Sequence, residues 1–389
     1  MDKTKVHKIE LREEFISPES EEKFNFCICD GIVKSIELDI RGTKNKFWIL
    51  DGNRKNQYLV KYEDKKNEST AGQFIMCGAL EQIGVPCAEY LVSEFVSKGI
   101  IKDSIISKNY KKKESEVEIS AYSLNRKKSE RDYDNNLGKK VRHAHTVYRY
   151  LDIFKQLYGR NDIDFDKIAL DLKTYALIQY IFLLTDLHYC NLTFIYDEKL
   201  GHKSLRVADF YDCGNVSTLN IAPSKIKNNL ERIRNSGKKS VVIENIIYKK
   251  MPLFGVKTEI CHIEDEKKKG ANICRPKSSY FSGVEEEIEA KKYLEILRNE
   301  LAIEIIESPE LYEVYKRIKD NVDIKKVANY YNAIKPETIP DFCVEMVEEI
   351  YNHNIKKLDK SIRKELLDRH TKKVEEEKLK KWLAYFIKK

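Results

Sequence analysis

Residues 181–216 read IFLLTDLHYCNLTFIYDEKLGHKSLRVADFYDCGNV and decide how the rest of the chain is interpreted. The stretch begins as an uncharged apolar run, which is typical of a buried helix. It breaks at Asp186 into a short polar loop that ends at Asn191. Two short β-branched and aromatic runs within residues 192–207 then predict a hairpin. The stretch therefore predicts a buried helix, a polar loop and a hairpin in succession.

Polar side chains in this stretch have the types and spacing that phosphoryl transfer requires. Asp186, on a loop at the end of a buried helix, can accept the proton of an attacking hydroxyl. Asn191 can offer a neutral oxygen to Mg²⁺, which usually takes only one or two protein carboxylates beside phosphates and water. The hairpin returns a second carboxylate, at Asp209 or Asp212, that can bridge Mg²⁺ to the phosphates of ATP.

The N-terminal part has a strand-like pattern. Residues 23–62 contain short β-branched and aromatic runs separated by Gly-containing turns. A helix is predicted over 70–83, because Gly84 follows it, and two more strands over 88–107. We expect an antiparallel sheet of roughly five strands with one helix packed on it. The polar residues 1–22 are expected to fray or to form a poorly packed edge.

The helical period dominates the remainder of the chain. Residues 108–140 are charged and poor in apolar side chains, and we interpret them as a linker with an exposed loop. The predicted helices cover residues 144–158, 166–185, 222–235, 284–306, 309–332, 339–357 and 359–387. Because strands and helices are segregated, the fold class is α+β. The predicted domains are an N-terminal lobe at 1–107, a linker at 108–145 and a helical lobe at 146–389.

Composition excludes several classes of protein. The chain has 389 residues, 42% of them hydrophobic, which argues against disorder of the whole chain. Its net charge of +8 is diluted among 63 acidic residues, so a dedicated nucleic-acid binder is not expected. The longest uncharged run, 175–185, is too short for a membrane helix, and the N-terminus lacks the apolar region of a signal peptide. The nine scattered cysteines favour free thiols in a reducing cytoplasm.

The motif D-x-H-x-x-N at 186–191, followed by a hairpin and Tyr-Asp, resembles the catalytic and metal-binding segments of HipA-like serine/threonine kinases. The resemblance implies a bilobal protein-kinase-like fold with an N-lobe sheet, one N-lobe helix and a largely helical C-lobe. It also implies that Asp186 is the catalytic base and that Asn191 and Asp212 bind the metal. Asp209 stands near the family's proline and is a rival to Asp212. Leu187 replaces the family's usual arginine.

The N-terminal part resembles the same family. Lys61 ends a predicted strand, where kinases place the lysine that orients the α- and β-phosphates. The family's glutamate that pairs with this lysine falls on Gln73, which can hydrogen-bond to Lys61 but cannot form an ion pair with it. The turn before Lys61 resembles the family's phosphate loop, and its nucleotide-binding residues would be Gly42, Thr43, Lys44 and Lys46.

The resemblance covers about residues 30–220 and is closest to the compact CtkA-type branch, which lacks the N-terminal HipA subdomain. It implies an ATP- and Mg²⁺-dependent serine/threonine kinase that transfers the γ-phosphate to a protein hydroxyl. Autophosphorylation of this chain is left open. The resemblance further implies a toxin-like or effector-like role in a bacterial-type cytoplasm, with secretion left open, and a separate antitoxin-like partner chain. No nucleic acid and no membrane are expected as partners. A pseudokinase that binds nucleotide or protein, and a lipid or small-molecule kinase, remain alternatives.

Overall fold

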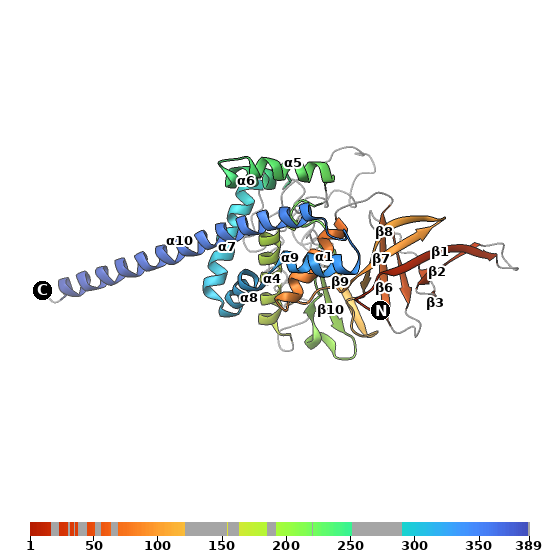
Figure 1. The fold of residues 1–389 in the computed structure, drawn as a ribbon. Coiled ribbons are helices and arrows are strands. Elements are labelled where there is room, and N and C mark those ends of the chain that lie inside the picture. The colour runs from red at the N-terminus through yellow and green to blue at the C-terminus, as the bar shows by residue number, and fades with distance from the viewer. Residues whose placement is uncertain are drawn as a thin grey trace, which may run out of the picture.

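The structure is a computed structural model with a sheet lobe and a helical lobe, and it confirms the predicted α+β class. Figure 1 shows the strands and the N-terminus on one side and most helices on the other, with helix α1 between them. The described residues are 1–16, 23–29, 32–34, 36–37, 45–50, 56–63, 69–120, 154, 163–184, 192–219, 221–250 and 290–387.

The N-terminal lobe is built on an eight-stranded sheet with the order β3-β2-β1-β7-β8-β6-β5-β4. Neighbouring strands run antiparallel, except that β1 pairs with β7 in parallel. The sheet is therefore mixed and larger than the five antiparallel strands predicted. The strands are β1 (His7–Ile16), β2 (Lys23–Cys29), β3 (Ile32–Lys34), β4 (Ile36–Glu37), β5 (Asn45–Leu50), β6 (Gln57–Glu63), β7 (Tyr90–Ser97) and β8 (Ile100–Lys108).

The expectation that residues 1–22 fray was wrong for β1, which lies inside the sheet between β2 and β7. His7 and Ile9 are fully buried, while the intervening Lys8 is exposed. This alternation with period two places one side of β1 in the core and leaves the charges outside. The His7 ring also hydrogen-bonds to the backbone oxygen of Asp2 at 2.7 Å, so its polar edge is satisfied. The high charge of the segment concealed the alternation.

The sheet is curled around a core of its own. Strand β2, near one end of the sheet, contacts β4 at the other end. The enclosed side chains come from most strands, and they include the stacked pair Tyr62 and Phe95, whose ring centroids lie 4.2 Å apart. The fully or nearly fully buried members are Ile9, Cys27, Cys29, Phe47, Ile49, Tyr58, Val60, Leu91, Phe95 and Ile106.

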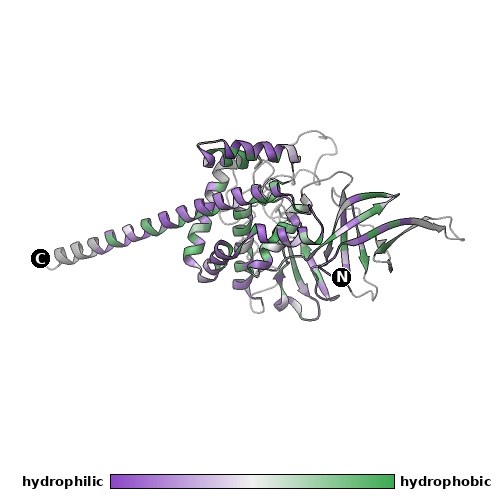
Figure 2. Cartoon of the chain, in the orientation of Figure 1, coloured by the Kyte–Doolittle hydropathy of each residue, from purple (hydrophilic) through white to green (hydrophobic). Residues whose placement is uncertain are grey.

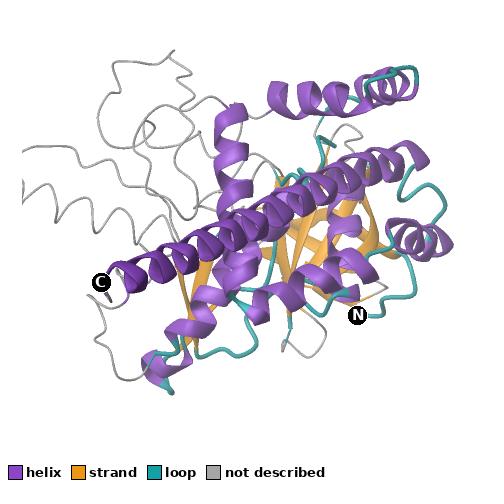
Figure 3. Cartoon of the chain, turned by 90° about the vertical axis from the view of Figure 1, so that its left-hand side faces the viewer, coloured by secondary structure: helices purple, strands orange, loops and turns teal. Residues whose placement is uncertain are grey.

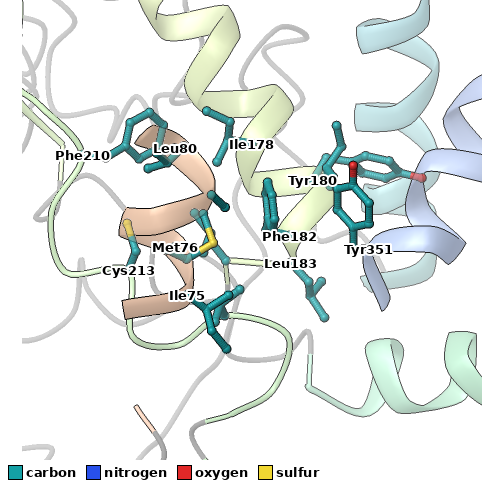
Figure 4. Close-up of a cluster of buried hydrophobic side chains, with 14 of the residues drawn as sticks. Ile75, Met76, Leu80, Ile178, Tyr180, Phe182, Leu183, Phe210, Cys213 and Tyr351 are labelled. Carbon is teal, nitrogen blue, oxygen red and sulfur yellow. The ribbon is translucent and has the colours of Figure 1, made fainter. Parts of the chain in front are cut away.

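Helix α1 (Ser69–Gln82) joins the two lobes and is buried on every side from Ala71 to Leu80. A helix that is apolar all round needs protein on all its faces, and α1 contacts β7, α9 and α10. Gly84, with φ +69°, lets the chain turn at the end of the helix. Figure 4 shows side chains of α1 packed against α4 and the segment carrying Phe210 and Cys213.

The helical lobe is organised around α4, which the sequence predicted within a few residues. Asp164 caps α4 by accepting a hydrogen bond from the Lys167 N–H at 3.0 Å, and Leu183 ends it in a left-handed conformation. The helices are α4 (Phe165–Phe182), α5 (Pro223–Arg234), α6 (Lys239–Lys250), α7 (Ala290–Glu307), α8 (Pro309–Asn321), α9 (Ile324–Ile334) and α10 (Asp341–Ile387).

Three predictions for the helical lobe need correction. The predicted helix 309–332 is two helices, because the Asp323 carboxylate accepts from the Lys326 N–H and starts a new one. The predicted helices 339–357 and 359–387 are one, since no proline or glycine interrupts them. Helix α6 was not predicted at all. The predicted helix at 144–158 lies outside the described residues except for the buried Phe154.

Helix α10 has a buried part and an exposed part. Its first half lies across the helical lobe in front of the strands in Figure 3, and Cys343, Val347, Ile350 and Leu358 are fully buried. Its second half extends beyond α7 and is mostly hydrophilic in Figure 2. The buried Asn354 donates to the carbonyls of Tyr180 and Ile181 at 2.9 and 3.2 Å, which fixes the end of α4 to α10.

A second sheet includes five residues of the stretch that was predicted to be a linker with an exposed loop. Its strands are β9 (Glu116–Ser120), β10 (Thr193–Asp197) and β11 (Arg206–Val207), in the order β11-β10-β9. The predicted hairpin is thus present as β10 and β11, and a short helical turn, η1 (Gly201–Ser204), lies between them. Strand β9, with its charged residues, pairs with β10 along the whole length of both strands. No helix in the described part of the chain is long and apolar enough to cross a membrane.

Candidate active site

Two of the predicted site residues, Lys61 and Asp212, form an ion pair. The Lys61 Nζ donates to the Asp212 Oδ1 at 2.9 Å. The Lys61 side chain is 11% exposed and that of Asp212 is 34% exposed, so the carboxylate is the more open partner. Lys61 lies on β6 of the sheet lobe, and Asp212 follows the hairpin of the second sheet. The fold therefore joins residues that are 151 positions apart in the sequence.

The backbone of Asp212 is held in an unusual conformation. Its φ of +55° lies in the left-handed region, which costs free energy for residues other than glycine but is better tolerated by Asp and Asn. The Asp212 N–H donates to the hydroxyl of the buried Tyr90 at 3.0 Å. Two residues later, Gly214 presses its carbonyl against Gly72 of α1. The backbone around Asp212 is thus held by contacts with β7 and with α1.

Gln73 also reaches this carboxylate. Its Nε2 lies 3.5 Å from the Asp212 Oδ1, and the residue is only 1% exposed. Among the described residues, no hydrogen-bond donor reaches the buried Gln73 Oε1. A buried amide oxygen that accepts no hydrogen bond costs free energy, so a conformation in which a nearby donor turns towards the Gln73 Oε1 would be stabilised.

Lys46 lies directly opposite Lys61 in the register of β5 and β6. Opposed residues of an antiparallel pair have their side chains on the same face of the sheet. Two like charges in this position are unfavourable to each other, and an anion on that face would stabilise both. The register therefore places two basic residues on the face of the sheet that carries the Lys61–Asp212 pair.

Asp209, the rival of Asp212, is engaged elsewhere. Its Oδ1 accepts from Arg206 Nη1 at 3.1 Å, and its side chain is 15% exposed. Arg206 also donates to Glu116 of β9, with its Nη2 3.3 Å from the Glu116 Oε1. Asp209 therefore belongs to a network that binds the hairpin to β9, and this network includes neither Lys61 nor Gln73.

Asp171 of α4 lies near this network, and its titration gives a testable prediction. Burial raises its pKa to about 6, against the opposing influence of Lys167 and Arg206. The pKa of this carboxyl is about 4 in the unfolded chain and about 6 in the folded protein. The folded state therefore loses stability as the pH increases from about 4 to about 6, and the whole loss is present above pH 6. Asp171→Asn should therefore stabilise the protein more at pH 7.5 than at pH 4.5, by about 2 kcal/mol.

Urea unfolding of Asp171→Asn and wild type at the two pH values measures this difference. Asp166→Asn is a matched control, because Asp166 is an exposed carboxylate of the same helix. As a change of a surface side chain, it should alter the free energy of unfolding by no more than about 0.5 kcal/mol at either pH. An equal change for Asp171→Asn at both pH values would contradict the assigned burial cost.

Several predicted site residues lie outside the described residues, namely Gly42, Thr43, Lys44, Asp186 and Asn191. The described ends of the segment 185–191 are nevertheless placed. Leu184 forms an isolated bridge with Val216, and the Thr193 carbonyl accepts from the Ala208 N–H at 2.8 Å. The chain thus enters and leaves this segment beside the stretch that carries Asp212.

The sequence did not reveal the residues that support the site. Tyr90 and Gly72 act through contacts with residues more than 100 positions away, which no local pattern indicates. Gly214, two residues after Asp212, was the one available signal for a tight approach of two backbones. Tyr211 was also missed as a packing residue: its ring stacks on Tyr110, with the centroids 4.9 Å apart.

Comparisons with known proteins bear on the fold. No protein-family model matches the chain, and no curated protein sequence is significantly similar to it. The crystal structure of the Helicobacter pylori proinflammatory kinase CtkA aligns over 85% of this chain and 95% of its own, with a TM-score of 0.53 and 13% identity. A candidate aminoglycoside phosphotransferase from Ralstonia eutropha aligns over 83% of this chain and 93% of its own, with a TM-score of 0.24 and 12% identity, too low to support an argument.

The alignment with CtkA concerns the fold as a whole, and the elements around the site of this chain follow one another along the sequence. A sheet strand carries the lysine, a single helix follows it, and a hairpin in the helical lobe precedes the aspartate. These likenesses are to the fold alone and do not support placement in the HipA-like branch. The chain has a bilobal protein-kinase-like fold.

Proposed function

We propose that this protein is an ATP- and Mg²⁺-dependent phosphotransferase, and specifically a serine/threonine protein kinase of HipA-like type. The observation that carries the proposal is the Lys61–Asp212 ion pair, 2.9 Å long, between the sheet lobe and the hairpin segment. A lysine and an acidic residue in these places are what nucleotide phosphates and their metal require in kinases. The alignment with a kinase at a TM-score of 0.53 supports the same class.

The residues present suit a magnesium nucleotide. The Asp212 carboxylate is one-third exposed and already faces a cation, and Asn191 could add a neutral oxygen. When bound, Mg²⁺ would neutralise charge on the β- and γ-phosphates. Lys61 would then leave Asp212 for the α- and β-phosphates, and it could donate to the Gln73 Oε1, which accepts from no donor among the described residues.

Asp186 is proposed to act on the acceptor. Its carboxylate would orient the acceptor hydroxyl and take its proton as the oxygen attacks the γ-phosphorus. The bond between the γ-phosphorus and the β–γ bridging oxygen breaks, and ADP carries away that electron pair. Lys46 and the turn at 42–44 would hold the phosphates in position, which is most of what this class of reaction asks of a protein.

One observation favours a second function, that of a nucleotide-binding module without transfer. Gln73 occupies the place of the glutamate that pairs with the lysine in kinases, and Lys61 pairs with Asp212 instead. A neutral amide cannot hold Lys61 by charge. Bound Mg²⁺-ATP would then stabilise the fold, and no phosphate would be transferred from the ATP.

The test is transfer from Mg²⁺-ATP by the purified chain, followed by intact mass and by phosphate counted on three added acceptors. These are a dephosphorylated serine-rich protein, a small amino alcohol and phosphatidylinositol vesicles. We expect whole phosphate units on the chain or on the added protein, and their loss in Asp186→Ala. Asp166→Ala, an exposed carboxylate of α4, should retain transfer.

Label found only on the lipid or the alcohol would overturn the protein-kinase assignment and leave phosphotransfer standing. Stabilisation by Mg²⁺-ATP without label on any acceptor would favour the binding module. Label that persists in Asp186→Ala would contradict the proposed role of that residue.

A further inference from the structure

Two thiols that phosphoryl transfer does not use lie against each other beside α1. Cys77 is on α1, and Cys87 is in the segment between α1 and β7. Their Sγ atoms are 3.7 Å apart, and both are free thiols. The Cys77 Sγ also lies 3.5 Å from the carbonyl oxygen of Ala88, so contacts run both ways between the helix and the segment.

The turn after α1 brings these sulfurs together. The Val85 N–H donates to the carbonyl of Leu80 at 3.0 Å, and Gly84 supplies the left-handed residue of the turn. The chain therefore reverses directly after the helix. A disulfide needs its sulfurs about 2.0 Å apart, so a closure of under about 2 Å would suffice.

The two thiols differ in acidity and in access. Because the Cys87 S–H donates to the Cys77 sulfur, the pKa of Cys77 is lowered and that of Cys87 is raised well above its usual range. Cys77 is 2% exposed, whereas Cys87 is half-buried and is the more exposed residue of the pair. Such an arrangement separates an attacking thiolate from a thiol that can later resolve it.

We propose that Cys77 and Cys87 form a reversible disulfide when the protein meets a small hydroperoxide. The Cys77 thiolate attacks the peroxide oxygen, the O–O bond breaks, and Cys77 becomes a sulfenic acid while the peroxide is reduced to hydroxide. The Cys87 sulfur then displaces the hydroxyl of the sulfenic acid and loses its proton. In sum, two thiols and one hydrogen peroxide give one disulfide and two waters, and a thiol reductant reverses the crosslink.

The crosslink would join two segments that flank the candidate site. Cys77 lies one helical turn after Gln73, which contacts Asp212. Cys87 forms a bridge with Phe210, two residues before Asp212, and the neighbouring Ala88 N–H donates to the Phe210 carbonyl at 2.7 Å. The oxidised protein should therefore hold α1 more firmly against the segment that carries Asp212.

The test oxidises the purified, reduced full chain with hydrogen peroxide and maps its disulfides. We expect a loss of two hydrogen masses, a Cys77–Cys87 crosslinked peptide, reversal by dithiothreitol and slower amide exchange in α1 of the oxidised form. In Cys87→Ser, Cys77 should instead be trapped as a sulfenic acid by a dimedone-type reagent. Cys343→Ser, which removes a buried thiol of α10, should leave the crosslink intact.

Several results would overturn the proposal. These are no mass loss with peroxide, a crosslink that maps to any other pair among the nine cysteines, or trapping on Cys87 rather than Cys77. Mapping of the wild-type chain decides the pairing even if a cysteine variant fails to fold. The inference does not rest on the proposed kinase activity, because none of its measurements requires ATP.

Discussion

Asp212→Asn should lower kcat/KM for transfer from Mg²⁺-ATP by roughly 10²–10³-fold, the loss seen when one preorganised electrostatic contact to a reacting group is removed. The substitution keeps the shape of the side chain and removes its charge. A neutral amide oxygen binds Mg²⁺ more weakly than a carboxylate does, and it cannot form an ion pair with the Lys61 ammonium. Transfer to the chain itself or to the acceptor identified by the screen above measures the effect.

The fold should survive this change. The Lys61 side chain is only 11% exposed, but asparagine keeps an oxygen to which Lys61 can donate, so the loss in stability should be about 1–3 kcal/mol. The Asp212 φ of +55° is one that asparagine tolerates as well as aspartate does, so no backbone strain is added. The melting temperature should therefore fall by only a few degrees, while activity falls by orders of magnitude.

Asp209→Asn is the comparison that separates the two carboxylates. Asp209 pairs with Arg206 in a network with little exposure, and its substitution removes one of the two carboxylates, Asp209 and Glu116, that pair with this arginine. We expect a lower stability, by about 1–3 kcal/mol, with transfer largely retained. The reverse pattern, in which Asp209→Asn abolishes transfer and Asp212→Asn preserves it, would show that Asp209 serves the metal.

The local parts of this fold were predictable because they depend on local patterns. The apolar run before Asp186 predicted α4, and the β-branched runs after it predicted the hairpin. Lys61 and Asp212 were both predicted from a resemblance to one kinase family, with Asp209 as a rival to Asp212, and the structure places Lys61 and Asp212 2.9 Å apart. These two residues, which lie far apart in the sequence, are the part of the site that the motifs allowed us to predict.

Two of the errors, those on β1 and β9, share a physical cause, which is that charged segments were taken to be exposed. Strand β1 and strand β9 both carry many charges, yet each pairs along a sheet. In β9 the charge of Glu116 is satisfied by Arg206, a contact 90 positions away in sequence. Burial of charge is possible when a distant partner exists, and the sequence does not reveal where that partner is.

Among single methyl groups added near the site, the one in Gly72→Ala is expected to reduce stability and phosphate transfer the most. A Cβ at Gly72 would stand 2.3 Å from the Gly214 carbonyl oxygen and 3.0 Å from the Val216 Cγ1. The nearer atom belongs to the backbone and cannot rotate away, so α1 or the segment after Asp212 must move. Alanine gains up to about 1 kcal/mol of helix propensity over glycine, and overpacking of this kind typically costs 1–3 kcal/mol or more.

Glycine-to-alanine changes elsewhere in the chain provide the controls. Gly78→Ala, on the same helix, would bring its Cβ to 2.5 Å from the Val327 Cγ1 of α9, so it should destabilise the fold away from Asp212. In the part of the chain that the structure describes, no atom lies within 4 Å of a Cβ added at Gly237, so Gly237→Ala should be close to neutral. Thermal unfolding of the three variants, beside transfer assays at a temperature where all are folded, separates stability from activity.

The contact between Gly72 and Gly214 predicts a specific difference between the two helix variants. Both should melt earlier than wild type, but only Gly72→Ala should also lose transfer when folded, because it displaces the backbone that positions Asp212. Equal transfer by folded Gly72→Ala and Gly78→Ala would mean that the position of α1 does not control Asp212. The close approach of Gly72 and Gly214 would then serve packing between the lobes alone.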